Sequence, residues 1–143
     1  MKLSIGTEQF GLDYGVTNLE KKYNNLSVDK HIIEIGKACQ LIWKKHAEAN
    51  NLDITISGLP KLSSFSLNSH LATQYTTRFT TEMLQRGYLA WRQFKPSYAH
   101  KESDLNLYDE AIGEVFNVIA NFKSDQILES PVAHNGFTRL TKE

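Results

Sequence analysis

The chain has 143 residues, a length that fits one compact domain, and 41% of them are hydrophobic, which is enough for a packed core. Sixteen basic and 16 acidic residues cancel, so no strong overall charge favours nucleic acid or an acidic membrane as a partner. A single cysteine excludes an internal disulfide framework, and no apolar run reaches the roughly 18 residues of a membrane span. With no signal-peptide pattern, we expect a cytoplasmic protein.

The first segment of the chain is rich in glycine. Gly6, Gly11 and Gly15 lie close together and indicate tight turns, so residues 1–18 are predicted to form a short strand and turns. Their spacing does not match a dinucleotide-binding fingerprint. The polar residues 19–27 that follow predict a linker.

Residues 29–50 have the pattern of an amphipathic helix. Apolar side chains recur at steps of three and four residues, at Ile32, Ile35, Cys39 and Ile42. Because Cys39 lies on this stripe, it is predicted to be a small core residue and not a nucleophile. Two alternating runs, residues 53–57 and 62–67, then predict an antiparallel pair of strands.

A change of period to four residues predicts a second helix over residues 71–86. Gly87 stands where a left-handed C-terminal cap belongs. Residues 88–94 predict a third strand, which must end or become an edge at Pro96 because proline cannot donate to a strand ladder.

The longest apolar stripe predicts a third helix over residues 103–124, with Ser103 as a candidate for its start. Residues 127–140 are expected to be irregular. These elements predict an α+β fold of two layers, in which helices pack on a small, mainly antiparallel sheet.

Several short sequence motifs follow one another in a set order over residues 27–140. They include Trp43-Lys44-Lys45-His46-Ala47-Glu48, Gly58-Leu59-Pro60, Phe65-Ser66, Phe79-Thr80-Thr81-Glu82-Met83-Leu84, Arg86-Gly87, Ser97-Tyr98-Ala99-His100 and Pro131-Val132-Ala133-His134. In this order they resemble the C-terminal small domain of the class III pyridoxal-phosphate aminotransferases, especially the glutamate-1-semialdehyde aminomutase branch. The resemblance implies that residues 28–143 form such a small domain, and that the parent enzyme transfers an amino group with pyridoxal phosphate.

In that family a separate large domain holds the coenzyme and supplies the lysine that binds it. No motif of this chain matches that domain, so we assign no catalytic and no coenzyme-binding residue, and we expect the chain alone to bind no pyridoxal phosphate. The resemblance implies two kinds of partner: an aminotransferase large domain or subunit, or a second copy that covers the same apolar surface.

The resemblance also identifies substrate-proximal candidates, because the family's small domain closes over the active site. They are Arg92, Lys95, Ser97 and His100. Basic side chains suit a carboxylate, although Arg92 and Lys95 also fit solvated surface charges. Lys95 stands where the aminomutase branch has an acid, which favours another amino or keto substrate.

Two other kinds of site find little support. Ser97 and His100 are a hydroxyl and a base, but no glycine-framed nucleophile elbow surrounds Ser97. The five histidines have no zinc-ligand spacing, so we expect no metal.

Residues 3–18 resemble the opening strand and turn of an aldo-keto reductase, a nicotinamide-dependent barrel. Such a barrel needs about 250 residues, so this chain cannot form one. Beside an aminotransferase fragment that is inactive alone, two alternatives therefore remain: a non-enzymatic protein-interaction module, and a remnant of a reductase.

Overall fold

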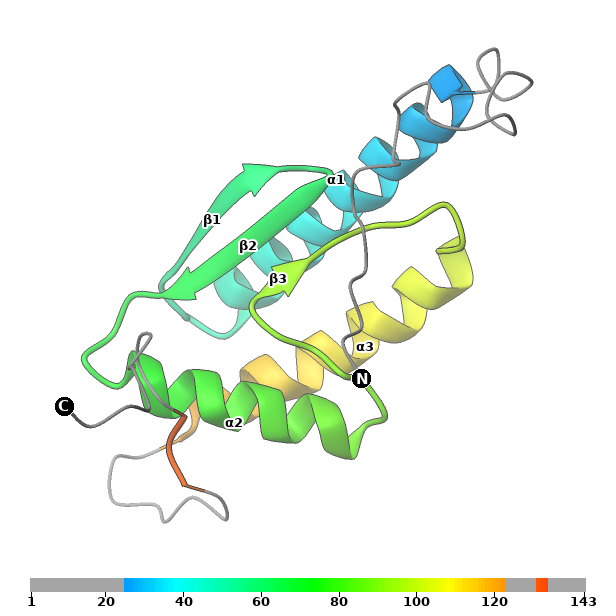
Figure 1. Cartoon of the computed structure of the whole chain (residues 1–143). Coiled ribbons are helices and arrows are strands. Elements are labelled where there is room, and N and C mark those ends of the chain that lie inside the picture. Colours follow the sequence, from blue (N-terminus) through cyan, green and yellow to red (C-terminus); the bar gives the residue numbers. More distant parts are fainter. Residues whose placement is uncertain (1–24, 123–130, 134–143) are drawn as a thin grey trace, which may run out of the picture.

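The computed structural model of the chain describes residues 25–122 and 131–133. Their elements are α1 (Asn25–Ala49), β1 (Ile54–Leu59), β2 (Leu62–Leu67), α2 (Ala72–Gln85), β3 (Gln93–Phe94) and α3 (Glu102–Ala120), as shown in Figure 1. Three helices and a small antiparallel sheet confirm the predicted α+β class. The reductase-like residues 3–18 lie outside the described residues.

The sheet has the strand order β1-β2-β3, and both pairings are antiparallel. Ile56 lies opposite Phe65, and Ser64 lies opposite Gln93. Since side chains alternate between the faces of a strand, β2 buries Phe65 and directs Ser64 to the other face. The helices contact this buried side: α1 packs on β1 and β2, α2 packs on β2, and α3 packs on both other helices (Figure 1).

One aromatic ring joins the sheet to all three helices. The ring centroid of Phe65 lies 5.0 Å from that of Trp43 on α1, 5.2 Å from that of Phe79 on α2 and 5.7 Å from that of Phe116 on α3. All four side chains are buried, and their tilted or edge-to-face geometry is the arrangement that aromatic pairs prefer. The core therefore sits where the middle strand meets the three helices.

Two positions require glycine, one for its backbone conformation and one for close packing. Gly87 has φ +85°, a left-handed conformation, and confirms the predicted cap after α2. Gly36 of α1 lies against the β1–β2 turn, where an added Cβ would collide with the carbonyl oxygen of Pro60. The absence of a side chain at Gly36 is what lets the hairpin lie directly on α1.

The predicted third strand is largely wrong. Only Gln93–Phe94 forms β3, and residues 88–92 are not in a strand. Residues 88–92 have the alternating pattern of a strand, but only a few residues of this segment before Pro96 pair with the backbone of β2. The first link of that pairing is the Phe65 N–H, which donates to the Arg92 carbonyl at 2.9 Å.

Two helix starts also differ from the predictions. Helix α1 begins at Asn25, inside the predicted linker 19–27. Helix α3 begins at Glu102, and Ser103 is not its cap. Instead the Asp104 carboxylate accepts the Lys101 backbone N–H at 2.8 Å, which satisfies one of the free donors at a helix start.

Two further features concern burial and the tail. Cys39 is a free thiol with no exposed surface, as the helical stripe predicted. Of the predicted irregular tail, residues 131–133 are described, and Ala133 donates its N–H to the Thr77 hydroxyl at 2.9 Å.

Among the described residues, no helix combines the length and the apolar character that crossing a bilayer requires.

Candidate functional site

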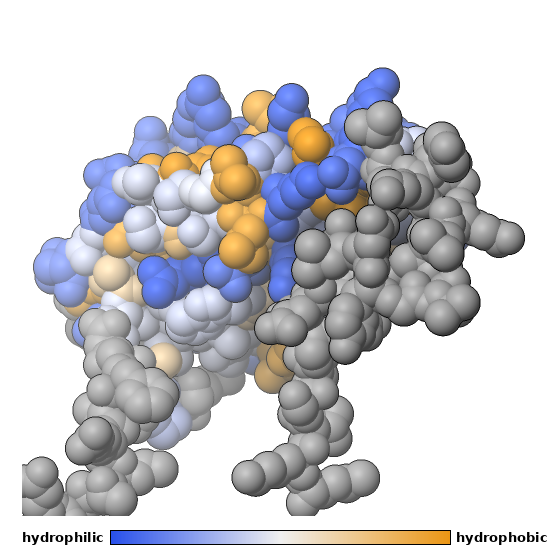
Figure 2. All heavy atoms as spheres, turned by 45° about the horizontal axis from the view of Figure 1, so that its top comes forward, coloured by the Kyte–Doolittle hydropathy of each residue, from blue (hydrophilic) through white to orange (hydrophobic). Residues whose placement is uncertain are grey.

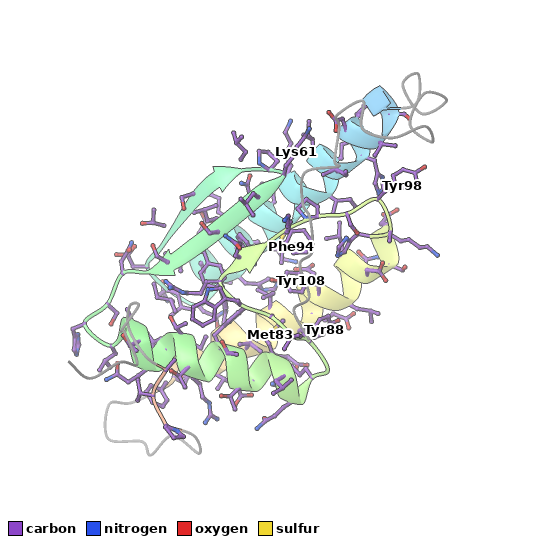
Figure 3. All side chains as sticks on the ribbon, viewed as in Figure 1. Lys61, Met83, Tyr88, Phe94, Tyr98 and Tyr108 are labelled. Atoms are coloured by element: carbon purple, nitrogen blue, oxygen red, sulfur yellow. The ribbon has the colours of Figure 1, made fainter. Side chains whose placement is uncertain are left out.

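A pocket of about 560 Å³ lies between the segment that contains β3, the turn at residues 97–100 and the first half of α3. Its walls are largely aromatic or apolar, and polar groups stand at its rim. The lining residues are Tyr88, Leu89, Ala90, Trp91, Gln93, Phe94, Lys95, Ser97, Ala99, His100, Asp104, Leu105 and Tyr108. Figure 3 shows Tyr88, Phe94 and Tyr108 side by side between β3 and α3.

The wall of the pocket is a packed aromatic group. Tyr108 stacks on Phe94 with 5.9 Å between ring centroids and meets Tyr88 edge to face, also at 5.9 Å. Its hydroxyl accepts the Trp43 indole N–H at 3.0 Å. Burial raises the pKa of Tyr108 far above its ordinary value, and burial likewise raises the pKa of the Cys39 thiol. Both groups therefore stay neutral, so they serve as packing and not as acid–base groups.

At the rim, Ser97 and His100 are in direct contact. The Ser97 hydroxyl lies 2.8 Å from Nδ1 of His100, and the Ser97 backbone N–H donates to the same nitrogen at 2.9 Å. Because a backbone N–H can only donate, Nδ1 accepts in this contact. His31 of α1 donates from Nε2 to the His100 carbonyl at 2.9 Å, which ties this turn to α1.

This geometry makes the Ser97–His100 pair a turn-stabilising contact. The two residues are three positions apart, and both Ser97 contacts are to Nδ1, whereas a catalytic serine hydrogen bonds to Nε2 of its histidine. Among the described residues, no carboxylate hydrogen bonds to the His100 ring to orient it as a base. Instead the ring lies edge to face with Phe94, 5.3 Å between centroids, and closes one side of the pocket.

The two basic candidates have different positions. Lys95 lines the pocket, is exposed, and makes no ion pair with a described carboxylate. Arg92 does not line the pocket. Its guanidinium carbon lies 5.1 Å from the Trp91 ring centroid, a cation–π contact, and its buried Nε has no hydrogen-bond partner. The structure thus brings Lys95, Ser97 and His100 to one pocket and turns Arg92 away.

The sequence analysis missed the aromatic wall and Asp104. Asp104 and Leu105 lie four and three positions before Tyr108, so both lie on the same side of α3 as Tyr108, near the start of the helix. That spacing was visible in the sequence. What it could not reveal was that Tyr88 and Phe94 would pack against this face, because that contact depends on the fold.

Two exposed apolar side chains, Leu89 and Trp91, line the pocket, and Tyr98, whose ring lies 5.3 Å from that of His31, belongs to the adjoining turn. Leu89 is 96% exposed, Trp91 47% and Tyr98 65%. Lone surface apolar residues are ordinary, but a group of them on a concave site is typical of a surface that meets a partner. We call this group, together with Lys95, the pocket face. On the side of the molecule shown in Figure 2, apolar residues are likewise exposed between hydrophilic ones.

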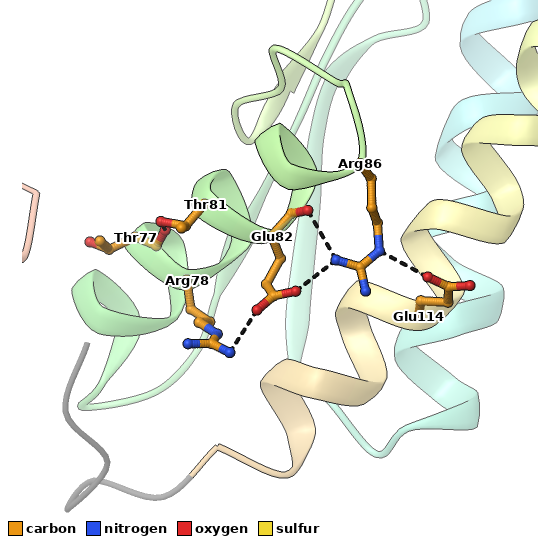
Figure 4. A network of polar contacts seen from close by, with 6 residues as sticks. All are labelled: Thr77, Arg78, Thr81, Glu82, Arg86 and Glu114. Carbon is orange, nitrogen blue, oxygen red and sulfur yellow. Dashed lines mark hydrogen bonds and ion pairs between the residues drawn. The ribbon is translucent and has the colours of Figure 1, made fainter. Parts of the chain in front are cut away.

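The most buried charged group lies elsewhere. Glu82 of α2 is 6% exposed, and its carboxylate contacts Arg78 and Arg86 at 2.6 Å each (Figure 4). Arg86 continues to Glu114 of α3 at 2.9 Å, and that hydrogen bond is the main cause that raises the pKa of Arg86. The network joins α2 to α3 and does not line the pocket, so its role is structural.

The residues that line this pocket do not supply the groups of a pyridoxal-phosphate site. Such a site needs a lysine amine, an acid for the pyridine nitrogen and donors for the phosphate. The pocket's one lysine, Lys95, is exposed, and the Asp104 carboxylate is engaged with the Lys101 backbone. Within the described part of the chain, no three His, Cys, Asp or Glu side chains are placed to hold a metal ion.

Comparison with known proteins gives no match: no protein-family model matches the sequence, and no curated protein does so either. The resemblance to aminotransferases therefore depends on the sequence motifs themselves.

Proposed function

We propose that this chain corresponds to the small domain of a class III pyridoxal-phosphate aminotransferase, in which another domain holds the coenzyme. On this proposal it acts by docking its pocket face against a large domain, and it does not transfer amino groups alone. The observation that supports the proposal is the pocket face itself, because Tyr98 lies within residues 92–100, which the resemblance assigns near substrate, and Leu89 and Trp91 lie just before them.

The energetics favour a partner for this face. Covering Leu89, Trp91 and Tyr98 would contribute about 1.5–3 kcal/mol for each fully buried large side chain. Contacts between domains of one chain commonly cover about 600–1,500 Å², so the partner proposed here would also cover residues around the pocket face.

Lys95 has a specific role in this proposal. Its ammonium has no described partner, and it stands at the rim where the partner would meet the pocket. An unpaired lysine there suits an anionic substrate group such as a carboxylate. We therefore propose an amino or keto acid as the substrate of the assembled enzyme. We also propose a cytoplasmic location, since one cysteine cannot form the internal disulfides that are common in secreted proteins.

The test is complementation. The chain is mixed with a class III aminotransferase that lacks its own small domain but holds the coenzyme, and transaminase activity is measured. The proposal predicts that activity rises with added chain, that the chain alone has none, and that Trp91→Asp abolishes the gain.

Leu41→Asp is the matched control, because Leu41 is an exposed leucine of α1 that does not line the pocket. It should leave the gain unchanged. Binding without any gain in activity would favour the interaction module instead. Activity of the chain alone with pyridoxal phosphate would contradict the proposal, as would equal loss in both variants.

A further inference from the structure

Among the described residues, no strand pairs with the outer edge of β1. The strand order places β1 at one edge, and Figure 1 shows no described element beside it there. Its sequence, Ile-Thr-Ile-Ser-Gly-Leu, contains no charged residue and no proline. Natural proteins use such residues to block pairing between exposed edges, so this edge lacks the common protection.

The hydrogen bonds of the hairpin determine which backbone groups face that edge. The Asn68 N–H donates to the Asp53 carbonyl at 2.9 Å, in the same register as the β1–β2 pairs. In an antiparallel ladder, hydrogen-bonded pairs alternate with non-hydrogen-bonded pairs. Thr55 and Ser57, two and four residues after Asp53, therefore bond to β2.

By the same alternation, Ile54 and Ile56 direct their backbone N–H and C=O groups outward, to the open edge. A hydrogen bond between β2 and the segment after α2 supports this alternation. The Phe65 N–H points away from β1 and bonds to the Arg92 carbonyl. The two isoleucine side chains are half-buried and pack against the core, so part of each is still uncovered.

We propose that β1 pairs antiparallel with β1 of a second copy of this chain, about a two-fold axis at Thr55. In this register Ile54 lies opposite the second copy's Ile56, and the outward N–H and C=O groups of both residues bond across the axis. The isoleucines meet on the face that carries the core, and the two copies of Thr55 meet on the polar face.

The edge of β1 is complementary to the same edge of a second copy because its side-chain pattern is symmetric. A two-fold interface requires that each surface be complementary to its own copy, and an Ile-Thr-Ile run paired antiparallel about its centre meets that condition. The result is one continuous sheet of both copies. The edge is separate from the pocket face, so the two proposals fail independently.

The test uses charge at the axis. Thr55 is exposed, and its backbone bonds to β2 do not depend on its side chain. In Thr55→Lys, two ammonium groups would face each other across the axis. We expect self-association, measured by sedimentation equilibrium, to weaken by about tenfold or more, since like charges in contact cost several kcal/mol. Thr55→Glu should weaken it equally, and an equimolar mixture of the two variants should associate again.

Ser64→Lys is the control, since it adds the same charge to the same polar face on the central strand β2. It should leave association unchanged. In the unmodified chain, hydrogen exchange should slow at the Ile54 and Ile56 amides as concentration rises, while the Thr55 amide is protected throughout.

Several results would overturn the proposal. They are a chain that stays monomeric at high concentration, association that Thr55→Lys leaves intact, and a mixture of variants that does not recover. Protection of the Ile54 and Ile56 amides at every concentration would mean that another segment of the same chain covers the edge, and it would also contradict the pairing.

Discussion

Replacing Phe65 with alanine tests whether the described domain is held together at one point. Phe65 is 2% exposed and its ring contacts one aromatic residue on each helix. Truncating a buried phenylalanine to alanine costs about 3–5 kcal/mol in lost burial and cavity formation. Because the three ring contacts are lost together, we expect Phe65→Ala to lower the free energy of unfolding by about 4 kcal/mol.

A loss of that size is a large share of the 5–15 kcal/mol that a domain of this kind has, so a milder variant is needed beside it. Phe65→Leu keeps much of the volume and loses the ring pairs, and should cost about 1.5 kcal/mol. Leu89→Ala, at a 96% exposed position, should change stability by less than about 0.5 kcal/mol.

Urea unfolding followed by tryptophan fluorescence measures all three variants. The midpoints should shift in that order with an unchanged denaturant slope. The reasoning is refuted if Phe65→Ala costs less than about 1 kcal/mol, or if Phe65→Leu costs as much as Phe65→Ala.

Three further predictions follow from contacts between elements. Glu82→Gln should cost about 2 kcal/mol in urea unfolding because it removes the buried carboxylate that Arg78 and Arg86 share, whereas Glu114→Gln, at a 66% exposed side chain, should cost less than about 1 kcal/mol; equal costs would contradict this account. Hydrogen bonding, first to Lys45, lowers the pKa of Asp109 below its ordinary 3.8. The Asp109 carboxylate therefore stabilises the fold fully above pH 3.8, and this stabilisation is lost as the pH falls through the lower pKa of the folded state. Asp109→Asn should reduce the acid dependence of the melting temperature, and an unaltered profile would count against the contact with Lys45. Gly36→Ala should destabilise the chain by about 1–3 kcal/mol, measured as a lower urea midpoint, because its Cβ would meet the hairpin turn; a neutral effect would show that the close approach is absent.

Much of the fold follows from periodicity. The stripe that contains Ile35 and Cys39 is one face of α1, and the two alternating runs form the β1–β2 hairpin. The third strand failed because alternation reports which side chains could share a face, but not whether a partner strand lies alongside. Leu89 has the pattern of a strand residue, yet it is almost fully exposed beside a segment without pairing.

The four substrate-proximal candidates stay a prediction, because the fold shows only where they lie. Lys95, Ser97 and His100 line one pocket. Arg92 does not line it, and its guanidinium lies over the ring of its neighbour Trp91. Ser97 and His100 are close in the sequence, so their contact could be predicted. That the contact stabilises a turn could not, because this depends on the Ser97 backbone N–H also reaching Nδ1.

The measurement that tests the central claim most directly is a titration of the chain into the coenzyme-loaded large domain of a class III aminotransferase that lacks its small domain, followed by the absorbance of the coenzyme. The account predicts a saturable change at one chain per large domain, which Trp91→Asp removes and Leu41→Asp does not. The absence of any change would contradict it. So would a visible band formed by the chain and pyridoxal phosphate alone that disappears on substitution of a single lysine.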